Sequence, residues 1–332
     1  MKPWLLACFL VASRVEAAPT VVVDKQFQLD QVALSPDGTT AFFVTGYDGG
    51  SRTPVLPRID ATLSSVSLAG GPRKVLYTGE VQDVVADATD VYFLNNERIW
   101  RMPRAGGKPT LLVNRADTLQ IIGPALNEES MLSLAIDDVN VYWAERNSGR
   151  IRSVSKTGGA ITTLATGQIG IGGLAVDSDH VYWTQTPQMR MGHEIKPKVA
   201  IQRVAKRGGA PEPLVSAVDA GEAFYLRIDA DTMYWLGDDA IKAAIKTGGA
   251  VRTILPERQY FAIDGDSIVI GGTTVRRIPK RGGAVTKLLD DPMPLAVAAA
   301  GGAIVVWSHD PNAIDMTPPA HWAPKDSIRR LQ

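Results

Sequence analysis

Cysteine is almost absent from this sequence, because Cys8 is the only one among 332 residues. Cys8 lies in an N-terminal segment that we expect to be removed, so the mature chain would contain no thiol. Disulfide bonds, thiolate catalysis and cysteine-ligated metal sites are then excluded for the mature protein.

The sequence also lacks an excess of charge of either sign. Lysine and arginine total 35, as do aspartate and glutamate, so the formal net charge is zero at pH 7. A chain without an overall positive field is not drawn to nucleic acid or to an anionic membrane. We therefore expect no nucleic-acid partner.

Long hydrophobic runs are missing, apart from a short one near the N-terminus. A basic residue precedes an apolar stretch over residues 4–12, and small residues follow up to Ala17. About nine apolar residues are too few to span a bilayer, but this order is typical of a secretory signal peptide. We expect residues 1–17 to be cleaved and residues 18–332 to form one secreted or periplasmic domain with no membrane span. Acylation at Cys8 is not expected, because the apolar stretch before it is too short for a lipoprotein signal.

One sequence motif recurs along the chain at intervals of roughly 34 to 52 residues. A small-apolar strand ends in an aspartate and is followed by a strand with an aromatic pair, as in Leu134-Ala135-Ile136-Asp137 and Val141-Tyr142-Trp143. Related copies are Leu174–Asp177 with Val181–Trp183, Ile228–Asp229 with Met233–Trp235, Val84–Asp87 with Val91–Phe93, and the weaker Ala262–Asp264 with Ile268–Ile270.

A third strand follows in each copy and runs into a glycine pair, after which comes a fourth apolar strand. The pairs are Gly70-Gly71, Gly106-Gly107, Gly158-Gly159, Gly208-Gly209, Gly248-Gly249 and Gly282-Gly283. Glycine supplies positive φ and aspartate caps its own backbone, so these are hairpin turns between antiparallel strands. A four-stranded unit cannot bury both of its faces alone, so neighbouring copies must cover it, with the Tyr-Trp pairs between them.

The number of copies predicts a seven-bladed β-propeller, with six blades as the alternative. Six copies carry a glycine pair, and a seventh starts at Pro294 but lacks a fourth strand. The segment Thr20-Val21-Val22-Val23-Asp24 reads as a fourth strand with no blade before it. We therefore expect the N-terminal strand to complete the last blade and close the ring, which removes exposed sheet edges.

These motifs resemble the Tyr-Trp-Thr-Asp propeller repeats of lipoprotein-receptor-type domains and related bacterial secreted propellers of the NHL type. Tyr182-Trp183-Thr184-Gln185 matches three of the four signature positions, while Tyr142-Trp143 and Tyr234-Trp235 keep the aromatic pair. Ser35-Pro36-Asp37-Gly38 is similar to the first hairpin of the periplasmic propeller of the Tol-Pal system. The resemblance implies a propeller fold, but such families include binding modules, lyases and lactonases, so it does not determine the activity.

One face of the ring would carry the repeated turns, with aspartates and lysines interleaved. Paired carboxylates could ligate a calcium ion, but every blade repeats this pattern and no copy gathers extra ligands, which favours turn chemistry. The members are Asp87, Asp137, Asp177, Asp179, Asp229, Asp231, Asp264, Asp266, Arg104, Lys156, Lys206, Lys246 and Lys280.

The opposite face would carry the long insertions, where a binding surface is usually found. The insertions are 46–62, 114–131, 186–200 and 309–325. Residues there could form a general acid/base or metal site, grip a polar ligand, or simply be solvated. The candidate binding residues are His193, Glu194, His309, Asp310, His321, Trp322, Glu145, Arg146, Asp48, Arg52, Asp238 and Asp239.

The expected innermost strands are rich in Ala, Val, Leu, Ile and Gly, which supplies few polar groups for catalysis. This composition favours a non-enzymatic module that binds a protein, peptide or glycan through the loop-rich face. The alternative is a metal-assisted lyase or a lactonase-type hydrolase at the axial mouth. We expect a monomer without a cofactor, or, under the alternative, one with a divalent cation such as Ca²⁺ or Mg²⁺.

Overall fold

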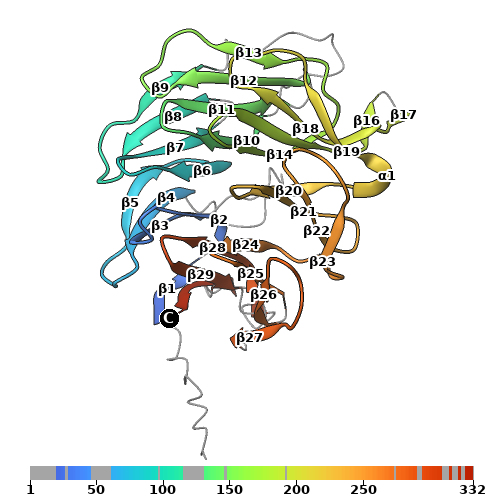
Figure 1. Ribbon diagram of the computed structural model, residues 1–332. Coiled ribbons are helices and arrows are strands. Elements are labelled where there is room, and N and C mark those ends of the chain that lie inside the picture. Colours follow the sequence, from blue (N-terminus) through green and yellow to red (C-terminus); the bar gives the residue numbers. More distant parts are fainter. Residues whose placement is uncertain are drawn as a thin grey trace, which may run out of the picture.

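Short antiparallel sheets surround a common axis in this protein (Figure 1). The computed structural model describes residues 20–26, 29–45, 61–95, 98–114, 131–145, 148–190, 193–272, 274–289, 294–308, 314–315, 321–322 and 326–331. The strands nearest to the axis in Figure 1 are β2, β6, β10, β14, β20, β24 and β28. The protein is therefore an all-β propeller of four-stranded sheets.

Six sheets are each formed by one continuous stretch of chain, and we number them as blades one to six. Blade one contains β2 (Leu29–Leu34), β3 (Thr40–Thr45), β4 (Thr62–Ser67) and β5 (Lys74–Thr78). Blade two contains β6 (Asp83–Ala86), β7 (Asp90–Asn95), β8 (Arg98–Pro103) and β9 (Thr110–Val113). Blade three contains β10 (Met131–Ile136), β11 (Asn140–Glu145), β12 (Arg150–Ser155) and β13 (Thr162–Ala165).

The next three blades repeat this order. Blade four contains β14 (Ile171–Val176), β15 (His180–Gln185), β18 (Val199–Ala205) and β19 (Glu212–Ser216), followed by the short helix α1 (Ala217–Ala220). Blade five contains β20 (Phe224–Ile228), β21 (Thr232–Leu236), β22 (Ile241–Ile245) and β23 (Arg252–Leu255). Blade six contains β24 (Phe261–Asp264), β25 (Ser267–Ile270), β26 (Val275–Pro279) and β27 (Thr286–Leu289).

The prediction of a seven-bladed propeller is wrong, and the count is corrected to six, the alternative. Six blades are each formed by one continuous stretch of chain, whereas the remaining sheet is assembled from the two ends of the chain. Its strands are β28 (Pro294–Ala300), β29 (Ala303–Ser308), β32 (Asp326–Leu331) and β1 (Thr20–Gln26). The order β1-β32-β29-β28 places the N-terminal strand at the outer edge, where Thr20 pairs with Arg330. The chain ends thus meet in one sheet, as the orphan strand at the N-terminus predicted.

Hydrophobic clusters between neighbouring sheets close the ring. Phe43 of blade one packs in one cluster with Val305 of the composite sheet, whose Val306 packs with Val269 of blade six. Side chains alternate along a strand, so successive residues of β29 face opposite neighbours. The composite sheet therefore joins both ends of the six-blade array.

The aromatic pairs follow the same alternation. Tyr142 and the Trp183 of the next blade share one cluster, while Tyr182 shares another with Trp235. All four side chains are at most 1 % exposed. Burial of one such ring removes about 150–250 Å² from water, worth about 4–6 kcal/mol as an upper estimate. The prediction that Tyr-Trp pairs pack between blades is confirmed.

The turn face ties each blade to its neighbour through a lysine and an aspartate. Asp137 Oδ1 accepts hydrogen bonds from the N–H groups of Val139 and Asn140, while Oδ2 accepts from Tyr142 Oη at 2.7 Å and from Lys206 Nζ of blade four at 2.5 Å. The equivalent pairs are Lys156–Asp87, Lys246–Asp177 and Lys280–Asp229. Burial alone would raise the pKa of Asp137, but the bonds from Lys206, Tyr142 and the backbone outweigh it and lower the pKa to about 2. These aspartates cap turns, as predicted, and also clamp adjacent blades.

Candidate functional site

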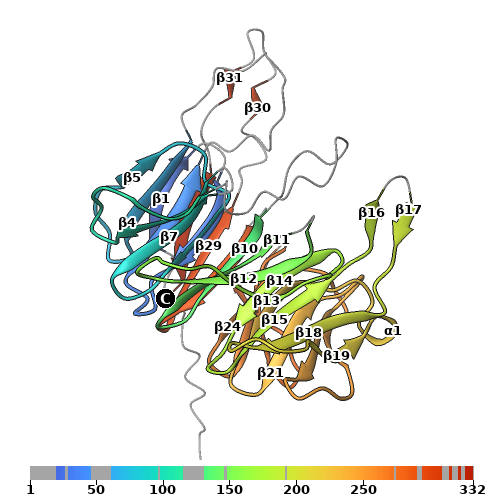
Figure 2. The same cartoon turned by 90° about the horizontal axis from the view of Figure 1, so that it is seen from above.

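A cavity of about 600 Å³ lies beside the axis, where the inner strands begin. Its lining includes the first residues of β6, β14 and β20, the residues before β24, and Thr186 and Leu236 at the ends of second strands. These strand ends belong to the face opposite the clamped turns, which is the face predicted to be loop-rich. In Figure 2 the two-stranded ribbons β16–β17 and β30–β31 also project together on one side. Their bounds are Gln188–Arg190, His193–Ile195, Ile314–Asp315 and His321–Trp322.

One position of the repeat lines this cavity in five blades. It lies four residues before the residue that occupies the turn-aspartate position, and it holds Asp83, Ser133, Gly173, Tyr225 and Tyr260. The repeat thus brings residues from distant parts of the sequence to one ring of side chains. Other positions of the repeat form the turns and pack between the blades, so the residue type at this position can differ from blade to blade.

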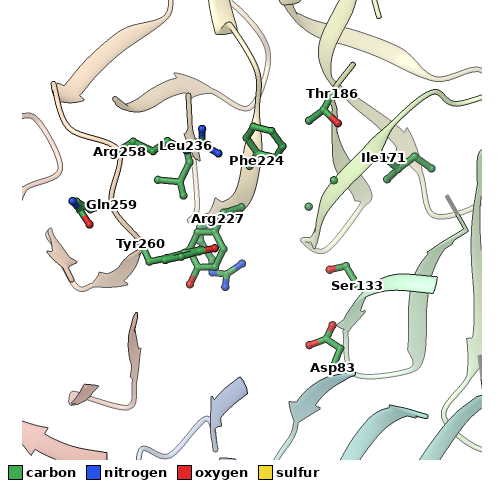
Figure 3. Close-up of a pocket in the computed structure, with 13 residues that line it drawn as sticks. Asp83, Ser133, Ile171, Thr186, Phe224, Arg227, Leu236, Arg258, Gln259 and Tyr260 are labelled. Carbon is green, nitrogen blue, oxygen red and sulfur yellow. The ribbon is translucent and has the colours of Figure 1, made fainter. Parts of the chain in front are cut away.

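Two arginines and several aromatic rings form one wall of the cavity (Figure 3). The Arg227 guanidinium lies 3.8 Å from the centre of the Tyr225 ring, and that of Arg258 lies 4.8 Å from the centre of the Phe224 ring. Among the described residues, neither arginine forms an ion pair, and both are exposed. Arg227 Nη1 donates a hydrogen bond to the Leu226 carbonyl at 2.9 Å. Stacking orients a planar guanidinium, and its remaining edge N–H groups stay available to an anion.

Tyr225 has an unusual backbone conformation, with φ of 49°. Phe224 pairs with Leu236 and Arg227 with Tyr234, so two residues of β20 oppose one residue of β21 in a bulge. Positive φ is costly for a residue other than glycine and is concentrated at functional sites. The corresponding bulge of blade four holds Gly172 and Gly173, and a Cβ on Gly173 would approach the Leu226 nitrogen to 2.6 Å, so glycine is required there by packing.

Asp83 stands on the opposite wall from the arginines, next to Ser133 (Figure 3). Its Oδ1 accepts a hydrogen bond from the Val84 N–H at 2.8 Å, and Oδ2 accepts one from the Leu134 N–H of blade three at 2.7 Å. Burial raises the pKa of Asp83 to about 6, against the lowering effect of these two bonds and of the Arg227 charge. The cavity therefore holds positive charge on one wall and a titratable carboxyl on the other.

Glu145, a predicted binding residue, is structural instead. It is 0 % exposed, and its carboxylate accepts hydrogen bonds from Trp143 Nε1 at 3.0 Å, Arg150 Nε at 2.6 Å and Arg152 at 3.0 Å. A buried carboxylate engaged by two arginines has no free edge for a ligand.

Other predicted residues lie on the loop-rich face but outside the cavity lining. Asp238 is exposed and accepts a hydrogen bond from the Glu222 N–H at 3.0 Å, which fixes the segment that leads into β20. Asp239 is exposed beside it. Glu194 is exposed on β17 and lies 3.2 Å from Lys196 Nζ. The Asp238 contact places one predicted residue next to the cavity rim.

The remaining predictions concern residues outside the described part of the chain. These are Asp48, Arg52, Arg146, His309, Asp310 and the N-terminal residues 1–17 with Cys8. For His193, His321 and Trp322 only the strand pairing is described, with His193 opposite Arg190 and His321 opposite Asp315. The acid/base or metal site suggested for these loop residues therefore stays a hypothesis.

Asp83, Arg227, Tyr225, Arg258 and Tyr260 were missed in the sequence. The prediction that the inner strands consist of Ala, Val, Leu, Ile and Gly is wrong, because β6 and β20 contain Asp83 and Arg227, and β2 and β10 contain polar residues as well. A signal was present, because Arg227 occupies the repeat position that holds Val85, Ala135, Ala175 and Ala262 in the other copies. A charged residue at a repeat position that otherwise holds small apolar residues indicates that this position has a role other than packing in that blade.

Among the residues that the structure describes, no group of three or more His, Cys, Asp and Glu side chains is placed to hold a metal ion. Within the same residues, no helix has the length and apolar character needed to cross a membrane.

The comparisons with known proteins bear on the fold alone. No protein-family model matches the chain, and no similar curated protein was found. A solved oligogalacturonate lyase in complex with manganese matches with a TM-score of 0.64 and 11% identity, covering 96% of this chain and 94% of that one. YCF48 bound to D1 peptide matches with a TM-score of 0.59 and 10% identity, covering 94% of each chain.

A third similar structure is PorZ, a bacterial surface component of the type-IX secretion system of Porphyromonas gingivalis. It matches with a TM-score of 0.59 and 14% identity, covering 86% of this chain and 36% of PorZ, so this chain spans about a third of that protein. These solved structures support the propeller fold. No family match supports the assignment of the repeats to the Tyr-Trp-Thr-Asp type.

Proposed function

We propose that the protein is an exported interaction module that binds a segment of a partner polypeptide in the axial cavity of its loop-rich face. The observation that carries this proposal is the pair of exposed guanidiniums, Arg227 and Arg258, each stacked on an aromatic ring and without an ion-pair partner among the described residues. Arginine held in this way suits the bidentate binding of a carboxylate.

The size of the cavity limits the ligand. About 600 Å³ lies within the range of small-molecule pockets, which accommodate a few side chains and not a globular surface. We infer that the partner presents an acidic residue on an extended segment or loop. YCF48, similar in fold, has been solved with a peptide, which agrees with this type of ligand without assigning it to this chain.

Fluorescence polarisation with labelled hexapeptides of acidic, neutral and basic composition tests the proposal, and neutral and acidic oligosaccharides serve as the glycan arm. Acidic peptides should bind most tightly, and Arg258→Ala should weaken that binding about tenfold or more, because a charge-assisted bond contributes about 1.5–3 kcal/mol. Arg207→Ala is the matched control, since Arg207 is exposed in a turn of the opposite face. Equal binding of all peptides, or no effect of Arg258→Ala, would contradict the proposal.

The proposed module works without a resident cofactor. The metal-assisted lyase or hydrolase alternative depends on His193 and His309, whose side chains lie outside the described part of the chain. A thermal-shift titration with Ca²⁺, Mg²⁺ and a chelator separates the two functions. We expect no change in Tm with either cation, whereas an increase of several degrees that His193→Ala or His309→Ala abolishes would favour the enzyme.

A further inference from the structure

The two walls of the axial cavity differ in charge, and this difference narrows the ligand class. The arginine wall comes from blade five and the segment before blade six, and the Asp83 wall comes from blades two and three. Figure 3 shows Asp83 and Ser133 on one side of the cavity, with Arg227, Arg258 and Tyr260 on the other. A ligand that bridges the cavity meets both walls.

Asp83 has acceptor capacity left for a ligand. A carboxylate can accept about four hydrogen bonds, and the Val84 and Leu134 N–H groups supply two. Among the described residues, no lysine or arginine forms an ion pair with Asp83, although the Arg227 charge acts on it across the cavity. Asp83 is partly buried, and a partly desolvated carboxylate without a cation is unfavourable, so a cationic ligand group at this wall would be stabilised there.

The clamp aspartates provide a comparison within the same molecule. Asp83 is the first residue of β6, and Asp87 directly follows the last residue of this strand. Asp87 also accepts hydrogen bonds from backbone N–H groups, but its Oδ2 lies 2.6 Å from Lys156 Nζ. Asp83 has the backbone bonds without the lysine. The missing cation is the feature that distinguishes the cavity carboxylate from the structural ones.

We propose that the axial cavity is a bipolar site for a mixed-charge peptide segment, whose carboxylate binds Arg227 and Arg258 and whose lysine or terminal ammonium binds Asp83. This inference rests on the proposed function and adds the second pole to it. The Tyr225 and Tyr260 rings, 5.1 Å apart between centres and edge to face, provide apolar surface for the aliphatic part of the segment.

Isothermal titration calorimetry with capped peptides tests both poles. The probes are acetylated and amidated peptides in which zero to three glycines separate the end residues, which are Glu and Lys, Glu and Gln, or Gln and Lys. We expect the Glu–Lys peptide at the best spacing to bind at least tenfold more tightly than either single-charge peptide. Asp83→Asn should remove the advantage of Lys over Gln and keep that of Glu over Gln, and Arg258→Ala should do the reverse.

The outcomes separate this inference from the proposed function. Equal affinity of the Glu–Lys and Glu–Gln peptides for the wild-type protein at every spacing would overturn the bipolar site and leave acidic-peptide binding intact. No binding of any Glu-containing peptide would contradict the proposed function as well. Because the Lys-to-Gln change is made in the ligand, the test holds even if Asp83→Asn does not fold.

Discussion

The carboxyl of Asp83 differs in its ionisation from the carboxyls of the clamp aspartates, which occupy a position four residues later in the repeat. Burial raises its pKa to about 6, whereas the clamp aspartates, paired with lysine, have pKa values below the ordinary range. The folded protein thus holds the Asp83 proton more tightly than the unfolded chain does. This group favours folding below pH 3.8, and that contribution is lost as the pH rises through about 6.

The affinity for a mixed-charge peptide should therefore depend on pH. Only ionised Asp83 attracts an ammonium, so the affinity should rise between pH 5 and pH 7.5 with a midpoint near the Asp83 pKa of about 6. Neither the glutamate nor the lysine of the probe titrates in this interval. Calorimetry at five pH values checks the midpoint, and the Asp83→Asn protein should give a flat profile. A pH dependence that persists in that variant would assign the titration to another group.

Glu145 illustrates the opposite case, a polar residue that stabilises the fold. Glu145→Gln should lower the free energy of unfolding by about 3–5 kcal/mol, because the change removes the buried carboxylate charge that pairs with Arg150 and Arg152. Urea unfolding measures the loss. Asp239→Asn, at an exposed position on the same face, is the control and should stay within about 0.5 kcal/mol of the wild type. A near-neutral Glu145→Gln would show that Glu145 is not structural.

At the scale of strands and turns, one hairpin serves two purposes. The aspartate that caps the first turn of a blade also accepts the lysine at the end of the third strand of the next blade. The sequence predicted the cap, because Asp and the residues after it form a local motif. It did not predict the clamp, because Lys206 and Asp137 are brought together only by blade stacking.

Removal of one clamp should therefore weaken an interface between blades by a modest amount. Lys206→Met should lower the free energy of unfolding by about 1 kcal/mol at pH 7, since the pair is partly screened by solvent. The folded pKa of Asp137 is depressed to about 2, so its contribution is present above the unfolded value of 3.8 and is lost as the pH falls through about 2.

Urea unfolding at pH 7, 4 and 2.5 should accordingly show the wild-type advantage over Lys206→Met shrinking toward acid pH. Lys196→Met is the matched control, because Lys196 is 69% exposed and its pair with Glu194 is a surface contact. A wild-type advantage that is constant with pH, or a control that is equally destabilised, would argue against the clamp.

For the whole molecule, the decisive element is the N-terminal strand. β1 pairs with β32 at the outer edge of the composite sheet, so its loss would expose that edge and weaken the one sheet that joins both chain ends. Deletion of residues 18–28 should lower the Tm by about 10 °C or more, the equivalent of several kcal/mol. Calorimetry of this deletion beside a chain that starts at residue 20 checks the effect. An unchanged Tm would show that the ring does not need this strand.

Most of the architecture could be predicted from the sequence, because the turns and strands of each repeat are specified by residues that are close together in the chain. Paired glycines such as Gly158 and Gly159 adopt positive φ in the turns where they were expected. The alternation of Tyr182 and Trp183 predicted two buried faces for the second strand. The unpaired first strand predicted closure of the ring, although the last sheet is composite while six blades are continuous.

The sequence by itself determined the hairpins, the stacked blades and the meeting of the two chain ends, since each follows from residues close together or from a pattern repeated many times. Only the tertiary structure decided which polar side chains face one another. Asp83 and Arg227 belong to different blades, and their cavity exists because ring closure brings one repeat position from several blades to the axis. That juxtaposition depends on packing between distant segments, which no local pattern encodes.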